Sequence, residues 1–169
     1  MKIKRNQSGF TLIEVVLVLA IGGLIFLLAF LAFQQVSTNR RDTQRRNDAG
    51  KVIAEVQNAT GDGSKISSQA TLTGGTAAVA PAAAAQTTIT GGFVKTYFNG
   101  SLKGPGDYYG WTYTAVTTAD VTPAGTKDIV YFANNAKCKP DAGGVFTPQT
   151  GANAVIVGLE KGAVCRDDQ

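Results

Sequence analysis

An unbroken apolar run dominates the first third of the chain. From Val15 to Phe33, nineteen consecutive residues are apolar or glycine, and no charged residue follows Glu14 until Arg40. In a helix that rises about 1.5 Å per residue, this run extends about 28 Å, close to the thickness of a bilayer core. A helix also satisfies its backbone polar groups within one segment, as lipid requires. The pattern predicts a transmembrane helix over residues 12–33.

The same helix is predicted to continue beyond the membrane. No proline interrupts residues 34–59, and Gly61 offers a C-terminal stop. Four apolar residues recur with the spacing i, i+3, i+4 and i+7, which is one face of an amphipathic helix: Ala49, Val52, Ile53 and Val56. We therefore expect one long helix over residues 10–60, with a membrane-spanning first half and a second half whose apolar stripe packs on a small domain.

The remaining chain divides by composition. Residues 61–92 are rich in Gly, Ala, Ser and Thr and are predicted to form a connecting surface loop with at most a short helix or strand. Residues 93–98 are ambiguous between helix and strand. Four later segments have the β-branched and aromatic pattern of strands: 109–116, 127–133, 153–159 and 163–166. Residues 93–169 are thus expected to form a small antiparallel β-sheet domain, and the fold class is α+β.

Cys138 and Cys165 are the only cysteines, and both follow the predicted membrane segment. An even pair beyond such a segment predicts a disulfide in an oxidising compartment. This bond would tie the loop after the second strand to the end of the chain. Closing a loop of that length stabilises a domain by roughly 3–4 kcal/mol in the chain-entropy description.

Composition argues against an enzyme. Histidine is absent, and the carboxylates and lysines show no catalytic or metal-ligand spacing. Three of the sixteen basic residues precede Phe10, so the thirteen that remain nearly balance the twelve acidic ones. A global electrostatic attraction to nucleic acid is not indicated. We expect no catalytic residues, no cofactor and no metal site.

The densest charge lies between Arg40 and Arg46. Because acidic residues are interleaved with the arginines, the pattern indicates a solvated helix face with ion pairs between near neighbours. Contact with anionic lipid headgroups or DNA is the functional alternative for this stretch.

Glu14 is the residue that a plain membrane anchor does not explain. A carboxylate near the front of an apolar run costs on the order of 1–3 kcal/mol, so it calls for a partner. A basic leader (Lys2, Lys4 and Arg5) precedes it, followed by Gly9 and the residues FTLIE. This arrangement resembles the class III signal of type IV pilins and related pseudopilins, and it covers about twenty-five residues.

The resemblance implies a specific processing pathway. A prepilin peptidase would remove residues 1–9 by cutting after Gly9, on the cytoplasmic side of the membrane, and would methylate the new amino terminus of Phe10. Glu14 matches the family glutamate that is thought to neutralise the amino terminus of a neighbouring subunit during assembly. A newly exposed α-amine and a carboxylate are each costly alone in lipid and are tolerated as a pair, although a pair within one chain is also conceivable.

The resemblance also implies a fold and a function. The fold would be the pilin lollipop, a long helix with a small sheet domain. The chain would be a structural subunit of a type IV pilus, held in the cytoplasmic membrane by a single pass with its N-terminus in the cytoplasm, and extracellular after assembly. Its partners would be further pilin subunits, prepilin peptidase and the pilus assembly machinery, with an unidentified surface ligand or DNA. The filament would serve adhesion, motility or DNA uptake.

Other interpretations remain open. A pseudopilin of a type II secretion or competence system has the same helix and signal, and a monomeric membrane-anchored binding module is a third class. A cleaved secretory signal fits poorly, because the apolar run is long, contains an acid and lacks a small-residue cleavage site after it. An uncleaved signal anchor fits better. The arginines after the run favour an outside N-terminus by the positive-inside rule, whereas the pilin interpretation places it inside.

Overall fold

The computed structural model describes residues 9–169, so most of the predicted leader lies outside the described residues. The described chain divides into two compact units. The N-terminal unit ends at Asn39, and the C-terminal unit comprises Arg40–Gln169.

One helix, α1, runs for 50 residues from Leu12 to Gly61. It passes without a break through Gly22 and Gly23, where an added Cβ would meet nothing within 4 Å. Among the described residues, α1 contains the one segment long and apolar enough to cross a membrane. The long N-terminal helix of the sequence analysis is therefore confirmed.

The C-terminal unit contains three short helices and a four-stranded sheet in addition to the second half of α1. The helices are α2 (Gln69–Thr73), α3 (Ala83–Gln86) and α4 (Gly92–Phe98), and the strands are β1 (Gly110–Tyr113), β2 (Ile129–Cys138), β3 (Phe146–Gly158) and β4 (Ala163–Asp167). The strand order in the sheet is β1-β2-β3-β4. This is the α+β class that the sequence predicted.

The expectation of a purely antiparallel sheet is wrong at one edge. β2 pairs antiparallel with β3, and β3 with β4, but β1 pairs parallel with β2 through the register Trp111 to Val130. The connection between β1 and β2 spans Thr114 to Asp128, which is long enough for the chain to cross back before β2 begins. Parallel neighbours need a connection of this length, whereas a tight hairpin would force an antiparallel pair.

The sheet has a hydrophobic core on each face. On one face, the predicted stripe of α1 is fully buried together with alternate strand residues, which are Val130, Phe132, Val155, Val157 and Val164. The intervening residues, among them Tyr131, Ala133 and Ile156, point to a second cluster on the opposite face. Because side chains alternate along a strand, burial of both sets shows that the sheet is covered on both sides.

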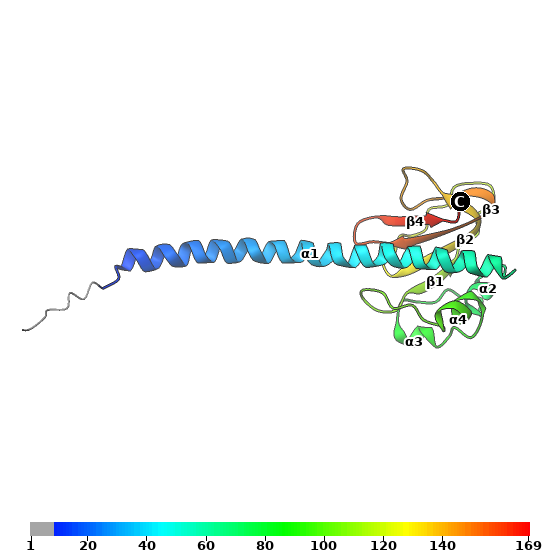
Figure 1. Ribbon diagram of the computed structural model, residues 1–169, viewed down its shortest axis with the longest axis horizontal. Helices are drawn as coiled ribbons and strands as arrows, with labels where there is room; N and C mark the ends of the chain where they lie inside the picture. Colours follow the sequence, from blue (N-terminus) through cyan, green and yellow to red (C-terminus); the bar gives the residue numbers. More distant parts are fainter. Residues whose placement is uncertain (1–8) are drawn as a thin grey trace, which may run out of the picture. The chain divides into compact units, whose positions relative to one another are not determined.

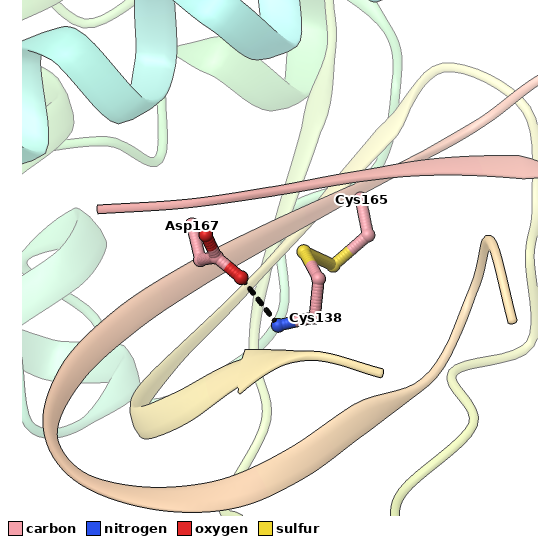
Figure 2. Close-up of a disulfide and its surroundings, with 3 residues drawn as sticks. All are labelled: Cys138, Cys165 and Asp167. Carbon is pink, nitrogen blue, oxygen red and sulfur yellow. Dashed lines mark hydrogen bonds between the residues drawn. A yellow bond between two sulfur atoms is a disulfide. The ribbon is translucent and has the colours of Figure 1, made fainter. Parts of the chain in front are cut away.

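The end of the β2–β3 hairpin covers the second face together with the connection between β1 and β2, which contributes Val116 and Val121. A register shift between Asn134 and Ala136 interrupts the pairing of β2 with β3, and Phe146 from the far end of β3 joins the second cluster. Cys138 on β2 is bonded to Cys165 on β4, although β3 lies between these strands in the sheet (Figure 2). The disulfide therefore fastens the hairpin end to the edge strand.

A hydrogen bond supports the disulfide. The carboxylate of Asp167 accepts a hydrogen bond from the backbone N–H of Cys138 at 2.8 Å, as Figure 2 shows. Two independent contacts thus hold the start of the hairpin loop against β4.

Removing this disulfide is expected to destabilise the C-terminal unit. The bond joins residues 27 positions apart, and its loss in Cys138→Ser/Cys165→Ser should lower the free energy of unfolding by about 3–4 kcal/mol. Urea unfolding of the detergent-solubilised full chain, followed by the fluorescence of buried Trp111, measures this change. Peptide mapping without reduction should find the two cysteines joined within one chain. Free thiols in protein isolated under alkylating conditions would contradict the prediction.

Residues 61–98 contribute to the core as well as connecting α1 to the sheet. Ile66, Leu72, Val79 and Ile89 are buried, and Val79 forms an antiparallel bridge to Trp111 along the outer edge of β1. Figure 1 shows α2, α3 and α4 gathered beside β1. The ambiguous segment 93–98 forms α4, which ends where Asn99 adopts the left-handed conformation.

Candidate functional site

The candidate site lies at the start of α1. Gly9 and Phe10 precede the helix, have no regular secondary structure and are exposed. An added Cβ at Gly9 would meet nothing within 4 Å, and its φ is not in the left-handed region. The fold of the described residues therefore imposes no requirement for glycine at this position, and the peptide bond after Gly9 is accessible.

Glu14 is bound within the first turn of the helix. Its Oε2 atom accepts hydrogen bonds from the backbone N–H of Thr11 at 3.1 Å and from the Thr11 hydroxyl at 2.9 Å. The Thr11 carbonyl in turn accepts from the N–H of Glu14 at 3.1 Å. This is the Glu-to-N-cap contact of a capping box, in which the third helical residue satisfies an otherwise unpaired N–H.

This local role of Glu14 was not predicted from the sequence. The signal was available, because Thr-x-x-Glu directly before an apolar run is the capping-box pattern. The two hydrogen bonds use only Oε2, and the described residues place no hydrogen-bond donor on Oε1. The cap therefore fixes the carboxylate at the helix start and leaves one of its oxygens able to accept from a further donor.

The apolar run presents an unpartnered surface. Every large apolar side chain from Phe10 to Val36 is exposed, with exposed fractions between 47% for Val36 and 88% for Phe10. In water this surface would cost free energy in proportion to its area, so it requires lipid or other apolar helices around it.

A second cluster lies at Arg45, the one arginine of the Arg40 to Arg46 stretch for which the predicted solvated face is wrong. Arg45 is only 2% exposed, and three carboxylates share its guanidinium. Nη1 donates to Asp42 at 3.0 Å and to Glu160 at 3.1 Å, and Nε donates to Asp128 at 3.0 Å. Asp42 also accepts from the backbone N–H of Glu160 at 2.9 Å.

The electrostatics of the cluster favour the charged forms of Arg45 and Glu160. Burial alone would lower the pKa of Arg45, but hydrogen bonds to Asp128, Glu160 and Asp42 outweigh burial, and the pKa is raised. The hydrogen bond from Lys127, followed by that from Arg45, lowers the pKa of Glu160. The cluster joins α1 to the residues that precede β2 and follow β3, so its role is structural.

Asp48 forms a related contact one turn further along α1. It is buried and accepts a hydrogen bond from the Tyr109 hydroxyl at 3.2 Å and one from Lys51 at 2.8 Å. Burial and the Asp48 carboxylate raise the pKa of Tyr109. Both arrangements depend on partners far away in the sequence, and for that reason helix-local reasoning did not find them.

Comparison with known proteins supports the assignment of the first site. Residues 4–30 match the prokaryotic N-terminal methylation motif. A search of curated proteins and a search of solved structures each returned no match. The chain therefore carries the class III signal of type IV pilin and pseudopilin precursors. That motif is typical of structural subunits that are anchored in a membrane before they assemble into a surface pilus.

Proposed function

We propose that the chain is the precursor of a type IV pilus subunit. Prepilin peptidase cuts it between Gly9 and Phe10 and methylates the new amino group of Phe10. The mature subunit, anchored by the apolar half of α1, then polymerises through this helix into a surface filament. The observation that carries the proposal is the methylation motif over residues 4–30, with Gly9 directly before FTLIE.

The geometry of Gly9 supports processing at this bond. The peptide bond lies outside the helix, in an exposed segment. The described residues impose no requirement for glycine there, and in the proposal the smallest residue lets the backbone approach the peptidase closely.

The geometry of Glu14 supports a role in assembly. Cleavage would create an α-amine at Phe10, adjacent to Thr11, whose N–H and hydroxyl already hold the Glu14 carboxylate. The second carboxylate oxygen, Oε1, is then the acceptor for the amine of a neighbouring subunit. Pairing removes two isolated charges from an apolar environment, where each is costly.

The C-terminal unit is consistent with the proposed pilus subunit. A C-terminal disulfide-bounded loop is a common feature of the pilins that this chain resembles, and Cys138 and Cys165 form such a bond here. In the proposal, the loop lies on the outside of the filament, where it meets surfaces. Electron microscopy of the material sheared from cells should therefore show filaments that carry this protein.

Processing has a direct test. The intact mass of the protein purified from its native membrane should correspond to the chain from Phe10 onward with one added methyl group. A mature chain that still begins at Met1, or one cut after the apolar run, would overturn the proposal.

A matched pair of variants checks that Gly9 is the recognised residue. Gly9→Val should leave the uncleaved precursor in the membrane, because a branched side chain blocks close approach to the backbone. Gly22→Val is the control, since an added Cβ there also meets nothing within 4 Å. Cleavage of the control should stay at the wild-type level. Normal cleavage of Gly9→Val would contradict recognition at Gly9.

A further inference from the structure

Three arginines on α1, at the start of the C-terminal unit, are exposed: Arg40, Arg41 and Arg46. The described residues form no ion pair with any of them. The two acids interleaved with them or next to them have other partners, because Asp42 binds Arg45, and Asp48 binds Lys51 and Tyr109. The pairing between near neighbours that would neutralise this stretch of α1 therefore does not form for these three arginines.

The turn between β3 and β4 brings a fourth cation to the same level of α1. Glu160, in this turn, accepts a hydrogen bond from Arg45 at 3.1 Å, and its backbone N–H donates to Asp42 at 2.9 Å. The next residue, Lys161, is exposed, and the described residues form no ion pair with it. Because the two contacts of Glu160 fix the turn against the helix, Lys161 lies beside the part of α1 that carries the arginines. We call these four residues the basic patch: Arg40, Arg41, Arg46 and Lys161.

The carboxylates nearby do not cancel the basic patch. The three carboxylates of the Arg45 cluster share two cations, Arg45 and Lys127, which leaves one excess negative charge. The adjoining loop 103–107 contributes one lysine and one aspartate, whose charges cancel. Four unpaired cations against one excess negative charge leave a net charge of +3 on this part of the surface.

The basic patch begins just beyond the membrane-spanning segment. The large apolar side chains of α1 are exposed as far as Val36, and lipid or other apolar helices must cover them. At 1.5 Å per residue, Arg40 and Arg41 follow Val36 by about 6–8 Å, and the headgroup region on each side of a bilayer is about 5–8 Å thick. Arg46 follows Arg41 by about 8 Å, which is the Debye length at physiological ionic strength, so it still adds attraction. When lipid covers the apolar run, phospholipid headgroups therefore lie at the level of the patch.

We infer that the basic patch binds the anionic phospholipid headgroups of the leaflet next to the C-terminal unit, before the subunit is assembled. A lipid phosphate accepts two parallel hydrogen bonds from one guanidinium, a geometry that arginine provides. Charge alone does not select this ligand. The bilayer that must cover the apolar run places phosphates at Arg40 and Arg41. The inference rests on the proposed function only in that the chain is held in a membrane before assembly.

Lipid retention measures this binding on the full chain. The protein is reconstituted in nanodiscs that contain equal amounts of phosphatidylglycerol and phosphatidylcholine, and native mass spectrometry counts the lipids of each kind that stay bound. The wild type should retain phosphatidylglycerol in at least about tenfold excess, because each basic residue near a membrane surface favours anionic lipid about fivefold.

A matched pair of triple variants assigns the preference to the basic patch. The patch variant, Arg40→Gln/Arg41→Gln/Lys161→Gln, should lower the phosphatidylglycerol excess at least about fivefold relative to wild type. The control variant loses the same charge from exposed residues on other elements, which also form no ion pair with the described residues: Lys65→Gln/Lys95→Gln/Arg166→Gln. Its excess should stay within about twofold of wild type. Trp111 fluorescence during unfolding verifies that both variants are folded.

Solid-state NMR tests for direct contact. In the same lipid mixture, dipolar coupling between the side-chain ¹⁵N of labelled arginine and the ³¹P of lipid should be detected in the wild type. This coupling should fall in the patch variant and persist in the control. Arg45 is the internal reference, because it is buried among carboxylates and should show no coupling to lipid.

The outcomes separate the inference from the proposed function. An unchanged excess in the patch variant, or an equal loss in the patch and control variants, would overturn the inference. If the wild type shows no lipid preference but binds a DNA duplex that the patch variant does not bind, the patch belongs to DNA and the inference is equally overturned. Filaments formed by a chain without lipid preference would leave the proposed function standing. Wild-type protein that prefers anionic lipid but is never processed or assembled would overturn the proposed function and leave the inference standing.

Discussion

Replacing Glu14 with leucine is expected to abolish filament assembly without impairing folding or membrane insertion. Folding of the C-terminal unit should be unaffected, because roughly 50 Å of helix separates Glu14 from the buried stripe that begins at Ala49. Insertion should improve, since an apolar side chain partitions into the membrane by about 1–3 kcal/mol better than a carboxylate. What the variant loses is the acceptor that we propose for the amine of Phe10.

Three measurements on Glu14→Leu check this expectation. Its intact mass should show cleavage after Gly9, and peptide mapping should show the bond between Cys138 and Cys165. The sheared-filament fraction should fall at least about tenfold while the protein accumulates in the membrane, as expected when one partner of a desolvated charge pair is removed. Methylation of Phe10 is measured in the same spectra. Filaments at the wild-type level would show that the pairing mechanism is wrong, even for a pilin.

The capping box supplies a second variant that separates charge from helix capping. Glutamine is accepted at the third helical position of a capping box, so Glu14→Gln should keep the contact to Thr11 while removing the negative charge. If recognition of the amine drives assembly, Glu14→Gln should fail as Glu14→Leu does. Assembly by the glutamine variant alone would assign the role of Glu14 to capping.

The sequence was informative where the signal is local and repetitive. The apolar run has the length of a membrane-spanning helix and the Ala49 to Val56 stripe has helical spacing, and α1 occupies Leu12–Gly61 with this stripe buried. Alternation over several residues also indicated the four later strands. The predicted bounds of two were too short, because β2 continues to Cys138 and β3 begins at Phe146, so Cys138 lies in a strand and not in the loop after it. The methylation motif is equally local, and it matches residues 4–30.

What the sequence did not reveal depends on contacts between distant segments. The parallel pairing of β1 with β2 depends on the path of residues 114–128, which have no distinctive pattern. Arg45 looked like its exposed neighbours because its partners Asp128 and Glu160 lie 83 and 115 residues away. Residues 93–98 are too few for their periodicity to decide between helix and strand. In the structure they lie in α4, with Phe93 and Val94 buried in the core.

Replacing Arg45 with leucine is expected to destabilise the C-terminal unit by about 3–5 kcal/mol at pH 7, because removing one partner of a buried ion pair leaves uncompensated charge. Asp42, Asp128 and Glu160 would then face one another with only Lys127 to offset them. Urea unfolding of the detergent-solubilised chain, followed by Trp111 fluorescence, measures the change.

An exposed arginine provides the matched control. Arg41 lies one turn earlier on α1 and is exposed. Since an exposed charge contributes little, Arg41→Leu should change the unfolding free energy by less than about 1 kcal/mol. Equal effects of the two substitutions would contradict the assignment of Arg45 as a buried ionic link.

The pH dependence of the Arg45 variant distinguishes lost charge pairing from lost packing. In the wild type, the pKa of Glu160 is lowered from its ordinary 4.5, first by Lys127 and then by Arg45. A lowered carboxylate pKa contributes stability that is present above the ordinary value and disappears as the pH falls through the lowered one. In Arg45→Leu the same acidification relieves repulsion among the carboxylates. The difference in the free energy of unfolding between wild type and variant should therefore shrink below about pH 4.5. A difference that stays constant from pH 7 to pH 3.5 would assign the effect to packing.

Neutralising a partner should then restore part of the stability at pH 7. Arg45→Leu/Asp128→Asn removes one of the uncompensated carboxylates and should recover at least about 1 kcal/mol relative to Arg45→Leu, because replacing both members of a buried ion pair costs less than removing one. In the wild-type background, Asp128→Asn alone should be destabilising, because it removes one of the carboxylates that pair with the buried Arg45 guanidinium. Asp128→Asn would then change the free energy of unfolding in opposite directions in the wild type and in Arg45→Leu, as expected for an ionic contact between Arg45 and Asp128. If the two side chains contributed only through independent packing, the substitution would change it in the same direction in both backgrounds.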